Sequence, residues 1–284
     1  MNYLDKLKRA AQKLKEADAI LVGAGAGLST AAGLVYDGDE WKNRFADFID
    51  KYHFPNLYYG GFGPFDSEEE MWAYWSRFIS MERYEPGPLP LYQKLKELLL
   101  SKDYFILTTN VDHCFQKAGF DKKRLFYTQG DYGLFQCSVP CHEITYDNHD
   151  QIMAMLEKQK SMQIPPELLP KCPICGKSMT LNLRSDNHFV EDQGWHDAEE
   201  RYEMFLADNY EDKNIVYLEL GVGDNTPAII RYPFQRLASR NPKASYIVIN
   251  LARFNPPLSI EDRSIFLQGD LNKTIQDLLI EIQK

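Results

Sequence analysis

The 284-residue sequence lacks several features that would place it in common functional classes. No apolar run approaches the ~20 residues needed to span a bilayer, and the charged segment Met1–Arg9 lacks the apolar core of a signal peptide. Basic residues number 32 against 41 acidic ones, whereas a face that binds nucleic acid needs a basic surplus. Five cysteines are too few for a disulfide scaffold. We therefore expect a globular, cytoplasmic protein that binds neither membranes nor nucleic acid.

The most distinctive stretch is Leu21–Leu34, in which Gly23, Gly25 and Gly27 alternate with small residues. A strand, a glycine turn and a helix in this order typically hold the phosphates of a nucleotide. Glycines allow close backbone approach, and free N–H groups at the helix start face the negative charge. Leu28 stands where the dinucleotide fingerprint has its third glycine, and no acidic residue closes a second strand about 20 residues on. The stretch therefore favours a phosphate-bearing ligand over hydride chemistry, the alternative being a tight turn without a ligand.

Apolar segments alternate with helical patterns along the chain, which indicates an α/β fold with a doubly wound parallel sheet. The predicted strands lie at 19–22, 104–110, 125–128, 214–220, 244–250 and 264–270. Helices are predicted at 2–17, 67–84, 91–100, 111–119, 197–212, 229–239 and 271–282. Residues 36–66 are rich in aromatic side chains and form either a loop that closes over a ligand or an aromatic-packed helical insertion.

Polar residues follow the strand predicted at 104–110. Ligands of open α/β sheets bind beyond the carboxyl ends of the strands, so Asn110 and Asp112 are candidate ligand contacts. The alternative is that Asn110 caps the helix predicted at 111–119. Two later strands likewise end in small or polar residues, at Gly221–Pro227 and at Asn250, and a turn is predicted at 129–133.

Four of the cysteines form two close pairs, Cys137 with Cys141 and Cys172 with Cys175. Two thiolates on each of two tight turns suit tetrahedral zinc, and Cys-Pro-x-Cys-Gly is a specific signal. The gap of thirty residues between the pairs exceeds the usual ~15–20, so we expect an inserted helix within Thr145–Pro170. His142 is an alternative ligand. A structural zinc is favoured because four thiolates leave no open position, and Cys114 is expected in the core.

Taken together, these motifs resemble the sirtuin family. The matching pieces occur in the family's order: Gly25-Ala-Gly-Leu-Ser-Thr-x-x-Gly33, Thr109-Asn-Val-Asp112, the two cysteine pairs, Leu220-Gly-Val-Gly223, Ile249-Asn250 and Gly269-Asp270. The resemblance implies a Rossmann-like NAD-binding domain at 1–35, 101–130 and 213–284. It also implies a helical and cofactor-loop insertion at 36–100 and a small zinc-ribbon-type insertion at 131–212. NAD would lie between the domains as co-substrate, and its nicotinamide–ribose bond would be broken.

The sequence departs from the sirtuin deacylases at several motifs. Their general base is a histidine before a glycine, and here the dipeptide is Gln129-Gly130. Glutamine has no useful basicity near neutral pH. Their Pro-Asp-Phe-Arg, Phe-Gly-Glu and adenosine-pocket Gly-Thr-Ser motifs are replaced by Gly33–Gly38, Phe189–Glu191 and Gly221–Gly223.

These departures resemble the bacterial macrodomain-linked (class M) sirtuins. That resemblance implies a protein ADP-ribosyltransferase with little or no deacylase activity. The implied acceptor is a lipoylated carrier protein related to the glycine-cleavage H protein, and a macrodomain hydrolase and a lipoate ligase are implied partners in the same pathway. The alternatives are an NAD-dependent lysine deacylase, an NAD hydrolase that uses water, and a non-catalytic NAD sensor.

The resemblance also assigns roles to single residues. Asn110 would orient the nicotinamide ribose, Asp112 would hold the nicotinamide amide, and Gln129 would hydrogen-bond the ribose hydroxyls or the acceptor. Arg184 would steer an acidic acceptor or a lipoyl carboxamide, or be a surface cation paired with Asp186. The other implied NAD contacts are Gly25, Ala26, Gly27, Ser29, Tyr36, Asp37, Gly221, Gly223, Asn225, Thr226, Asn250 and Asp270.

Overall fold

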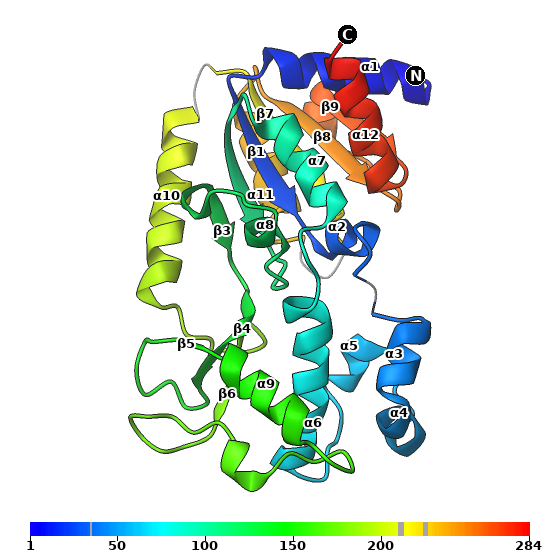
Figure 1. Cartoon of the computed structure of the whole chain (residues 1–284). Helices are drawn as coiled ribbons and strands as arrows, with labels where there is room; N and C mark the ends of the chain where they lie inside the picture. The colour runs from blue at the N-terminus through cyan, green and yellow to red at the C-terminus, as the bar shows by residue number, and fades with distance from the viewer. Residues whose placement is uncertain (35, 210–212, 224–226) are drawn as a thin grey trace. The chain divides into compact units, whose positions relative to one another are not determined.

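The computed structural model describes residues 1–284 except 35, 210–212 and 224–226, and the chain forms two compact units (Figure 1). Unit 1 comprises Met1–Gly33, Pro88–Gln129 and Gly194–Lys284, and unit 2 comprises Leu34–Gly87 and Gly130–Gln193. Unit 1 therefore takes in two segments that the predicted boundaries placed in the insertions. These segments hold helix α7 (Pro90–Leu99) and nearly all of helix α10 (Gln193–Asn209).

Unit 1 is built on a six-stranded parallel sheet in the order β3-β2-β1-β7-β8-β9. The strands are β1 (Ala19–Ala24), β2 (Asp103–Thr108), β3 (Leu125–Tyr127), β7 (Ile215–Leu220), β8 (Ser245–Asn250) and β9 (Ser264–Gln268). This is the Rossmann order, in which the first strand is central and the chain winds outward in both directions. Every residue of β1 and β7 is buried, as expected for strands covered on both faces. The predicted doubly wound sheet is confirmed.

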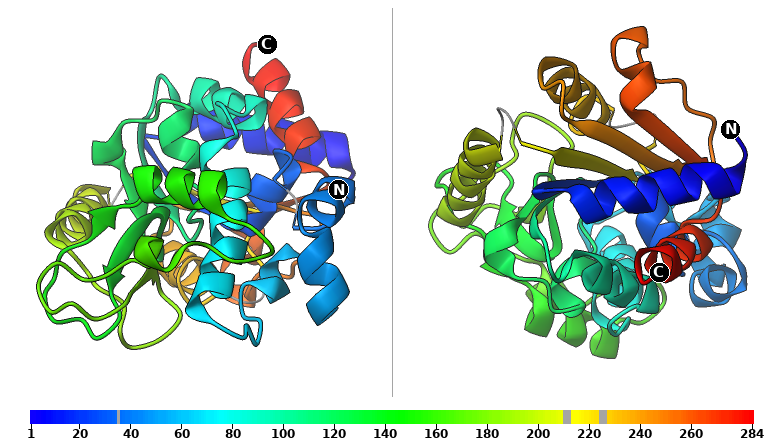
Figure 2. Two further views of the ribbon diagram at one scale, coloured as in Figure 1. Left: turned by 60° about the horizontal axis from the view of Figure 1, so that its bottom comes forward. Right: turned by 90° about the horizontal axis from the view of Figure 1, so that it is seen from above.

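Helices cover both faces of this sheet. Helices α10 and α11 (Arg231–Arg240) pack on one face, where Phe205 and Phe234 join the core of the strands. Helices α1 (Tyr3–Glu16) and α12 (Leu271–Ile282) lie on the face opposite α11 (Figure 2), and α12 also packs against α7. Helices α7 and α10 belong to unit 1 because their apolar faces pack against its core and its helices.

Unit 1 also contains several short helical elements. Helix α8 spans only Cys114–Lys117, because His113 has a left-handed φ of 65° before it and Gly119 a φ of 77° after it. The helix predicted over 111–119 is thus mostly turn. Helix α2 is Ala26–Ala31, and 3₁₀ turns occupy Lys122–Arg124 and Leu258–Arg263.

Unit 2 contains a three-stranded antiparallel sheet in the order β5-β4-β6. Strand β4 is Gly130–Cys137, β5 is Tyr146–Asp147 and β6 is Met179–Leu183. The turn predicted at 129–133 is therefore wrong after Gly130, since the chain enters β4 there. Helix α9 (His149–Lys158) and the 3₁₀ turn Pro166–Leu168 fill the gap between the cysteine pairs, so the predicted helix in the insertion is confirmed.

The aromatic segment of unit 2 folds into short helices rather than an open loop. These are α3 (Asp39–Arg44), α4 (Ala46–Tyr52) and α5 (Leu57–Gly60), followed by α6 (Glu68–Ile79) and a π-helical turn at Ser80–Tyr84. Phe45 and Phe48 are fully buried, with ring centroids 4.8 and 5.2 Å from that of Tyr74. The segment is thus the aromatic-packed helical insertion. Within the described ranges, no helix combines the length and apolarity required to cross a membrane.

Candidate functional site

Two glycine turns meet at the carboxyl ends of the adjacent strands β1 and β7. The N–H of Gly27 donates to the carbonyl oxygen of Gly221 over 2.9 Å. A Cβ on Gly25 would lie 2.8 Å from the Cα of Val222, and one on Gly27 would lie 2.7 Å from the Gly221 oxygen. Gly221 itself has a φ of +59°. Glycine is therefore required here by the contact between two turns, a reason internal to the fold and additional to the predicted approach of a phosphate.

Several backbone N–H groups of the first turn are used within the protein. Gly25 donates to the carbonyl of Leu220, and Leu28 donates to the carbonyl of Gly25, each over 3.0 Å. The expectation of free N–H groups is therefore wrong for Gly25, Gly27 and Leu28. The exposed residue of this turn is Ala26, one of the predicted NAD contacts.

A buried polar cluster joins the first glycine turn to the end of β2. The Oγ of Ser29 lies 2.8 Å from the Tyr92 hydroxyl oxygen and 3.0 Å from the Asn110 Nδ2, and it donates to the Asp112 carboxylate. The same Asn110 amide also donates to the carbonyl of Gly25 over 3.1 Å. All four side chains are buried. The structure thus brings together Ser29, Asn110 and Asp112, which the sequence placed in one site.

Sequence reasoning missed Tyr92, the fourth member of this cluster. Burial raises the pKa of Tyr92 well above its ordinary value, and the charge of Asp112 raises it further. The phenol therefore stays protonated and can donate to Ser29, whose own proton goes to Asp112. Nothing in the pattern of α7 distinguishes Tyr92 from the other residues on the buried face of that helix.

The structure rejects the alternative that Asn110 caps a helix. Helix α8 begins at Cys114, and the Cys114 N–H donates to the carboxylate of Asp112 over 2.9 Å. Asp112 therefore bonds both the start of α8 and Ser29, whereas the amide of Asn110 points to the glycine turn. Cys114 is buried, as predicted for a core residue.

The ends of β7 and β8 hold the other predicted contacts of unit 1. Asn250 donates to the carbonyl of Val222 over 2.9 Å, and Asp270 caps α12 by accepting from the Lys273 N–H over 2.8 Å. Gly223 is exposed, and a Cβ there would meet no heavy atom of the described chain within 4 Å. Asn225 and Thr226, also predicted contacts, lie outside the described residues.

An ion pair that sequence reasoning missed lies behind this second turn. The fully buried Glu219 of β7 accepts hydrogen bonds from Arg231 Nε and Nη2, both over 3.0 Å, and from the Tyr246 hydroxyl. Burial raises the pKa of Glu219, against the lowering effect of Tyr246 and Arg231. A charged residue inside the apolar segment 215–220 was the signal that could have found it.

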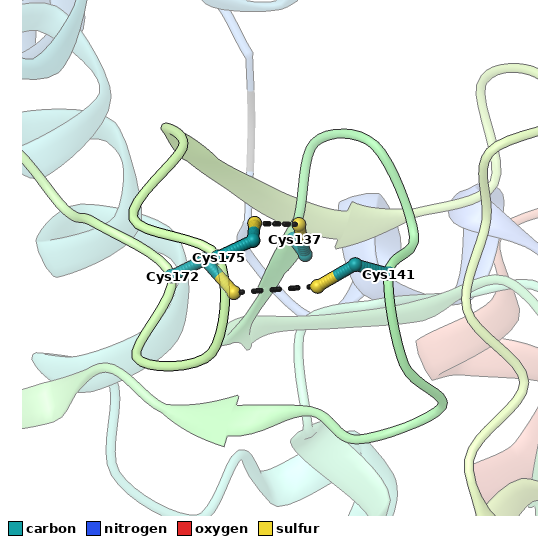
Figure 3. Close-up of side chains that lie close together, drawn as sticks. All are labelled: Cys137, Cys141, Cys172 and Cys175. Atoms are coloured by element: carbon teal, nitrogen blue, oxygen red, sulfur yellow. Dashed lines mark hydrogen bonds between the residues drawn. The ribbon is translucent and has the colours of Figure 1, made fainter.

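The four paired cysteines of unit 2 converge (Figure 3). The Sγ atoms of Cys137 and Cys175 lie 3.6 Å apart, those of Cys141 and Cys172 lie 3.7 Å apart, and all four lie within 4.8 Å of one another. Zinc–sulfur bonds of about 2.3 Å in a tetrahedron place sulfurs about 3.8 Å apart, so the cluster fits one structural zinc ion. His142 lies beside the cluster, with its Nδ1 3.0 Å from the Sγ of Cys141.

Backbone geometry supports the same interpretation. Burial alone would raise the pKa of Cys137, but hydrogen bonds from the backbone N–H groups of Cys141 and Val139 bring it down to about 6. The pKa of Cys172 is likewise lowered by the N–H groups of Cys175 and Ile174, against the effect of burial. Turns that hold N–H groups toward sulfur stabilise the thiolate form that binds zinc.

Comparison with known proteins places this arrangement in a family. No protein-family model matches the chain. A solved Sir2 enzyme is 18% identical with a TM-score of 0.60, covering 98% of each chain. A Sir2 homologue solved with NAD is 16% identical with a TM-score of 0.58, covering 97% of this chain and 93% of that one. A protein ADP-ribosyltransferase from Staphylococcus aureus is 38% identical over 281 residues, which cover 97% of this chain and 89% of that protein. The chain belongs to the protein ADP-ribosyltransferases, and its fold is that of the Sir2 enzymes.

A second relative of this chain joins two activities in its name. A probable bifunctional ADP-ribose hydrolase/ADP-ribosyltransferase from Fusarium oxysporum is 32% identical over 290 residues, which cover 96% of this chain and 47% of that protein. The chain thus spans about half the length of this fungal relative.

Three further predicted site residues are not members of the polar cluster. Gln129 is half-buried in the turn between β3 and β4, at the end of the Pro88–Gln129 segment of unit 1. Tyr36 and Asp37 belong to unit 2, where the Tyr36 ring stacks 6.1 Å from that of Phe78 and its carbonyl accepts from the Leu57 N–H.

Arg184 follows β6 in unit 2 and pairs with an unexpected partner. Its guanidinium lies 2.5 Å from the Glu191 carboxylate and 4.2 Å from the centroid of the Phe189 ring. Asp186, the partner considered from the sequence, instead accepts from the His188 N–H over 2.7 Å. The pairing with Asp186 is therefore wrong, and both Phe189 and Glu191 come from the segment that replaces the deacylase Phe-Gly-Glu motif.

Proposed function

We propose that this protein transfers ADP-ribose from NAD to a lipoylated carrier protein related to the glycine-cleavage H protein and releases nicotinamide. The observation that carries the proposal is Gln129, a residue without a basic lone pair at the position of the deacylase histidine. The identity to the Staphylococcus aureus ADP-ribosyltransferase supports the transfer, and the resemblance to the class M sirtuins supports the choice of carrier.

The chemistry of the acceptor explains why glutamine suffices. The bond from C1′ of the ribose to the nicotinamide nitrogen breaks, nicotinamide leaves with the bonding electrons, and an acceptor oxygen bonds to C1′. A carboxylate is already ionised at neutral pH, so this attack needs no general base. Deacylation, in contrast, needs a base to take a proton from a ribose hydroxyl. A glutamine is therefore compatible with transfer and poorly compatible with deacylation.

The polar cluster of unit 1 fits a role in orienting NAD. It places an amide, a hydroxyl and a carboxylate beyond the carboxyl end of β2, where groups of this kind can hold ribose hydroxyls or a carboxamide. Asn110 is anchored to Ser29 and to the Gly25 carbonyl, so its side chain is held in one orientation. Exact orientation of a reacting group is worth orders of magnitude in rate.

Arg184 fits contact with an anionic acceptor. Its guanidinium is already stacked on Phe189 and paired with Glu191, so little side-chain entropy is left to lose when a second carboxylate binds. We expect an acidic group of the acceptor to compete with Glu191 for this guanidinium. Arg184→Gln should then raise the KM for the carrier about tenfold or more while leaving the affinity for ADP-ribose unchanged.

The central experiment measures transfer of label from NAD to purified carrier, with and without its lipoyl group. We expect labelling of the lipoylated carrier by the wild type, and a loss of about a hundredfold or more in Asn110→Ala. Asn272→Ala is the matched control, because Asn272 lies on α12 and bonds only Lys94 among the described residues. Equal labelling of the unlipoylated carrier, or an unimpaired Asn110→Ala, contradicts the proposal.

The same preparation separates the alternative functions. Mass spectrometry of an acylated peptide incubated with enzyme and NAD detects a deacylase. Equal release of free ADP-ribose with and without carrier indicates a hydrolase. Binding of NAD without release of nicotinamide indicates a sensor. The proposal expects no deacylated peptide and a release of nicotinamide that depends on the carrier.

A further inference from the structure

The carbonyl of Val222, in the turn after β7, is held from two sides. Arg231 Nη2 donates to it over 2.7 Å and Asn250 Nδ2 donates to it over 2.9 Å. A carbonyl oxygen has two lone pairs, so both are engaged. The Val222 side chain is itself buried. This residue therefore has one position relative to the sheet.

Gly221, the residue before Val222, is also fixed by hydrogen bonds. The N–H of Gly221 donates to the carbonyl of Ile249 over 3.1 Å, and its own carbonyl accepts from Gly27. Its φ of +59° is a conformation that glycine adopts without strain. Gly221 and Val222 are thus both fixed by hydrogen bonds, and together they determine the position of the exposed Gly223.

Arg231 is oriented for this contact by the groups around it. Nε and Nη2 both bond one oxygen of the fully buried Glu219, whose other oxygen accepts from Tyr246. The ring of Phe254 lies 5.7 Å from the guanidinium. A buried ion pair seldom adds stability over an apolar pair of similar volume, because desolvation of the charges is costly. Stability alone therefore does not explain the pair of Glu219 and Arg231, whereas a role in fixing the Val222 carbonyl does.

We infer that Arg231, held by Glu219, is a positioning residue that sets the loop Gly221–Gly223 for the adenosine-bearing half of NAD. Glu219 aims the guanidinium, the guanidinium holds the Val222 carbonyl, and that carbonyl determines where Gly223 meets the nucleotide. The inference rests on the use of NAD in the proposed function, and it is independent of the identity of the acceptor.

The test compares Arg231→Lys with the wild type in calorimetric binding of ADP-ribose and in steady-state kinetics with NAD. Lysine keeps a positive charge beside Glu219, but one ammonium group lacks the fork that serves Glu219 and Val222 together. We expect the Kd for ADP-ribose and the KM for NAD to rise about tenfold, as for a lost charged hydrogen bond. The kcat at saturating NAD should stay within about twofold, because the nicotinamide end is untouched.

Arg263→Lys is the matched control. Arg263 also holds backbone carbonyls, those of Ala238 and Asn241, but at the far end of α11. Its substitution should leave the Kd for ADP-ribose unchanged. A folded Arg231→Lys that binds ADP-ribose within twofold of the wild type overturns the inference, as does an equal loss of affinity in Arg263→Lys.

A second variant covers the case in which Arg231→Lys does not fold. The double substitution Glu219→Gln with Arg231→Met removes both charges of the pair, so neither is left uncompensated. It should fold and show the same rise in the Kd for ADP-ribose, and normal binding would refute the positioning role. Because ADP-ribose binding involves neither carrier nor nicotinamide release, failure to label the carrier leaves this result intact and counts only against the proposed acceptor.

Discussion

The contact between the two glycine turns makes Gly27→Ala the most informative single substitution in unit 1. The new methyl group would lie 2.7 Å from the Gly221 oxygen, 2.9 Å from its Cα and 3.1 Å from its carbonyl carbon. All three are backbone atoms of a turn that is itself hydrogen-bonded on both sides. No flexible side chain is available to move aside, so the turns must separate.

The expected change in the free energy of unfolding is the difference between a steric cost and a gain in helix propensity. Overpacking a well-packed site costs typically 1–3 kcal/mol, and a collision with pinned backbone falls at about the upper end of that range. Alanine offsets about 1 kcal/mol of this, because glycine is the poorer residue inside a helix and Gly27 lies in α2. We therefore expect a net loss of about 2 kcal/mol in the free energy of unfolding, or a fall of about 4–8 °C in Tm for a domain of 150–250 residues.

The measurement is urea unfolding followed by circular dichroism, with Gly223→Ala as the matched control. A Cβ on Gly223 meets no described heavy atom within 4 Å, so its substitution should change the free energy of unfolding by less than about 0.5 kcal/mol. If Gly223 faces the nucleotide, that variant should lose affinity for ADP-ribose while keeping its stability. The reasoning is refuted if Gly27→Ala unfolds at the same urea concentration as the wild type.

Three further predictions concern other parts of the molecule. Chelation of zinc, or Cys175→Ser, should unfold unit 2 as seen by near-ultraviolet circular dichroism, since the metal's binding energy is folding energy; an unchanged spectrum after verified metal loss would contradict this. Glu85→Gln should lower stability at pH 7 by about 0.2–1 kcal/mol, and this loss should shrink as the pH falls below the unfolded pKa of Glu85. The hydrogen bond from Arg44 lowers the pKa of Glu85, so its contribution is present above the unfolded pKa and is lost as the pH falls through the folded value. Tyr92→Phe should cost about 0.5–1.5 kcal/mol in urea unfolding, because Ser29 loses a buried donor; equal stability would remove Tyr92 from the cluster.

The local patterns of the sequence were sufficient for most elements of unit 1. Continuous apolar strands such as 215–220 and amphipathic helices such as 271–282 appear where they were predicted. The prediction of a helix over 111–119 was wrong because His113 adopts a left-handed conformation. That conformation arises from the surroundings of His113, and the periodicity of apolar residues carries no information about them. Strand β4 was missed beyond Gly130, because its partners β5 and β6 come later in the chain and pair with it only after folding.

The residues of the candidate site also fall into those that the sequence predicted and those that only the structure revealed. Residue type and spacing alone identified the four thiolates of the zinc cluster. They also placed Asn110 and Asp112 beyond the end of one strand and Ser29 in the turn after another, because these residues belong to recognisable local motifs. Only the tertiary structure decided that Asn110 bonds the glycine turn rather than a helix end. It also decided that Gly25 and Gly27 accommodate a second turn, and that Glu219 and Arg231 form a pair. The contacts of Asn110, Gly25 and Gly27 join segments distant in sequence, and they exist only once the parallel sheet has aligned its carboxyl ends. The pair of Glu219 and Arg231 depends on how α11 packs beside β7.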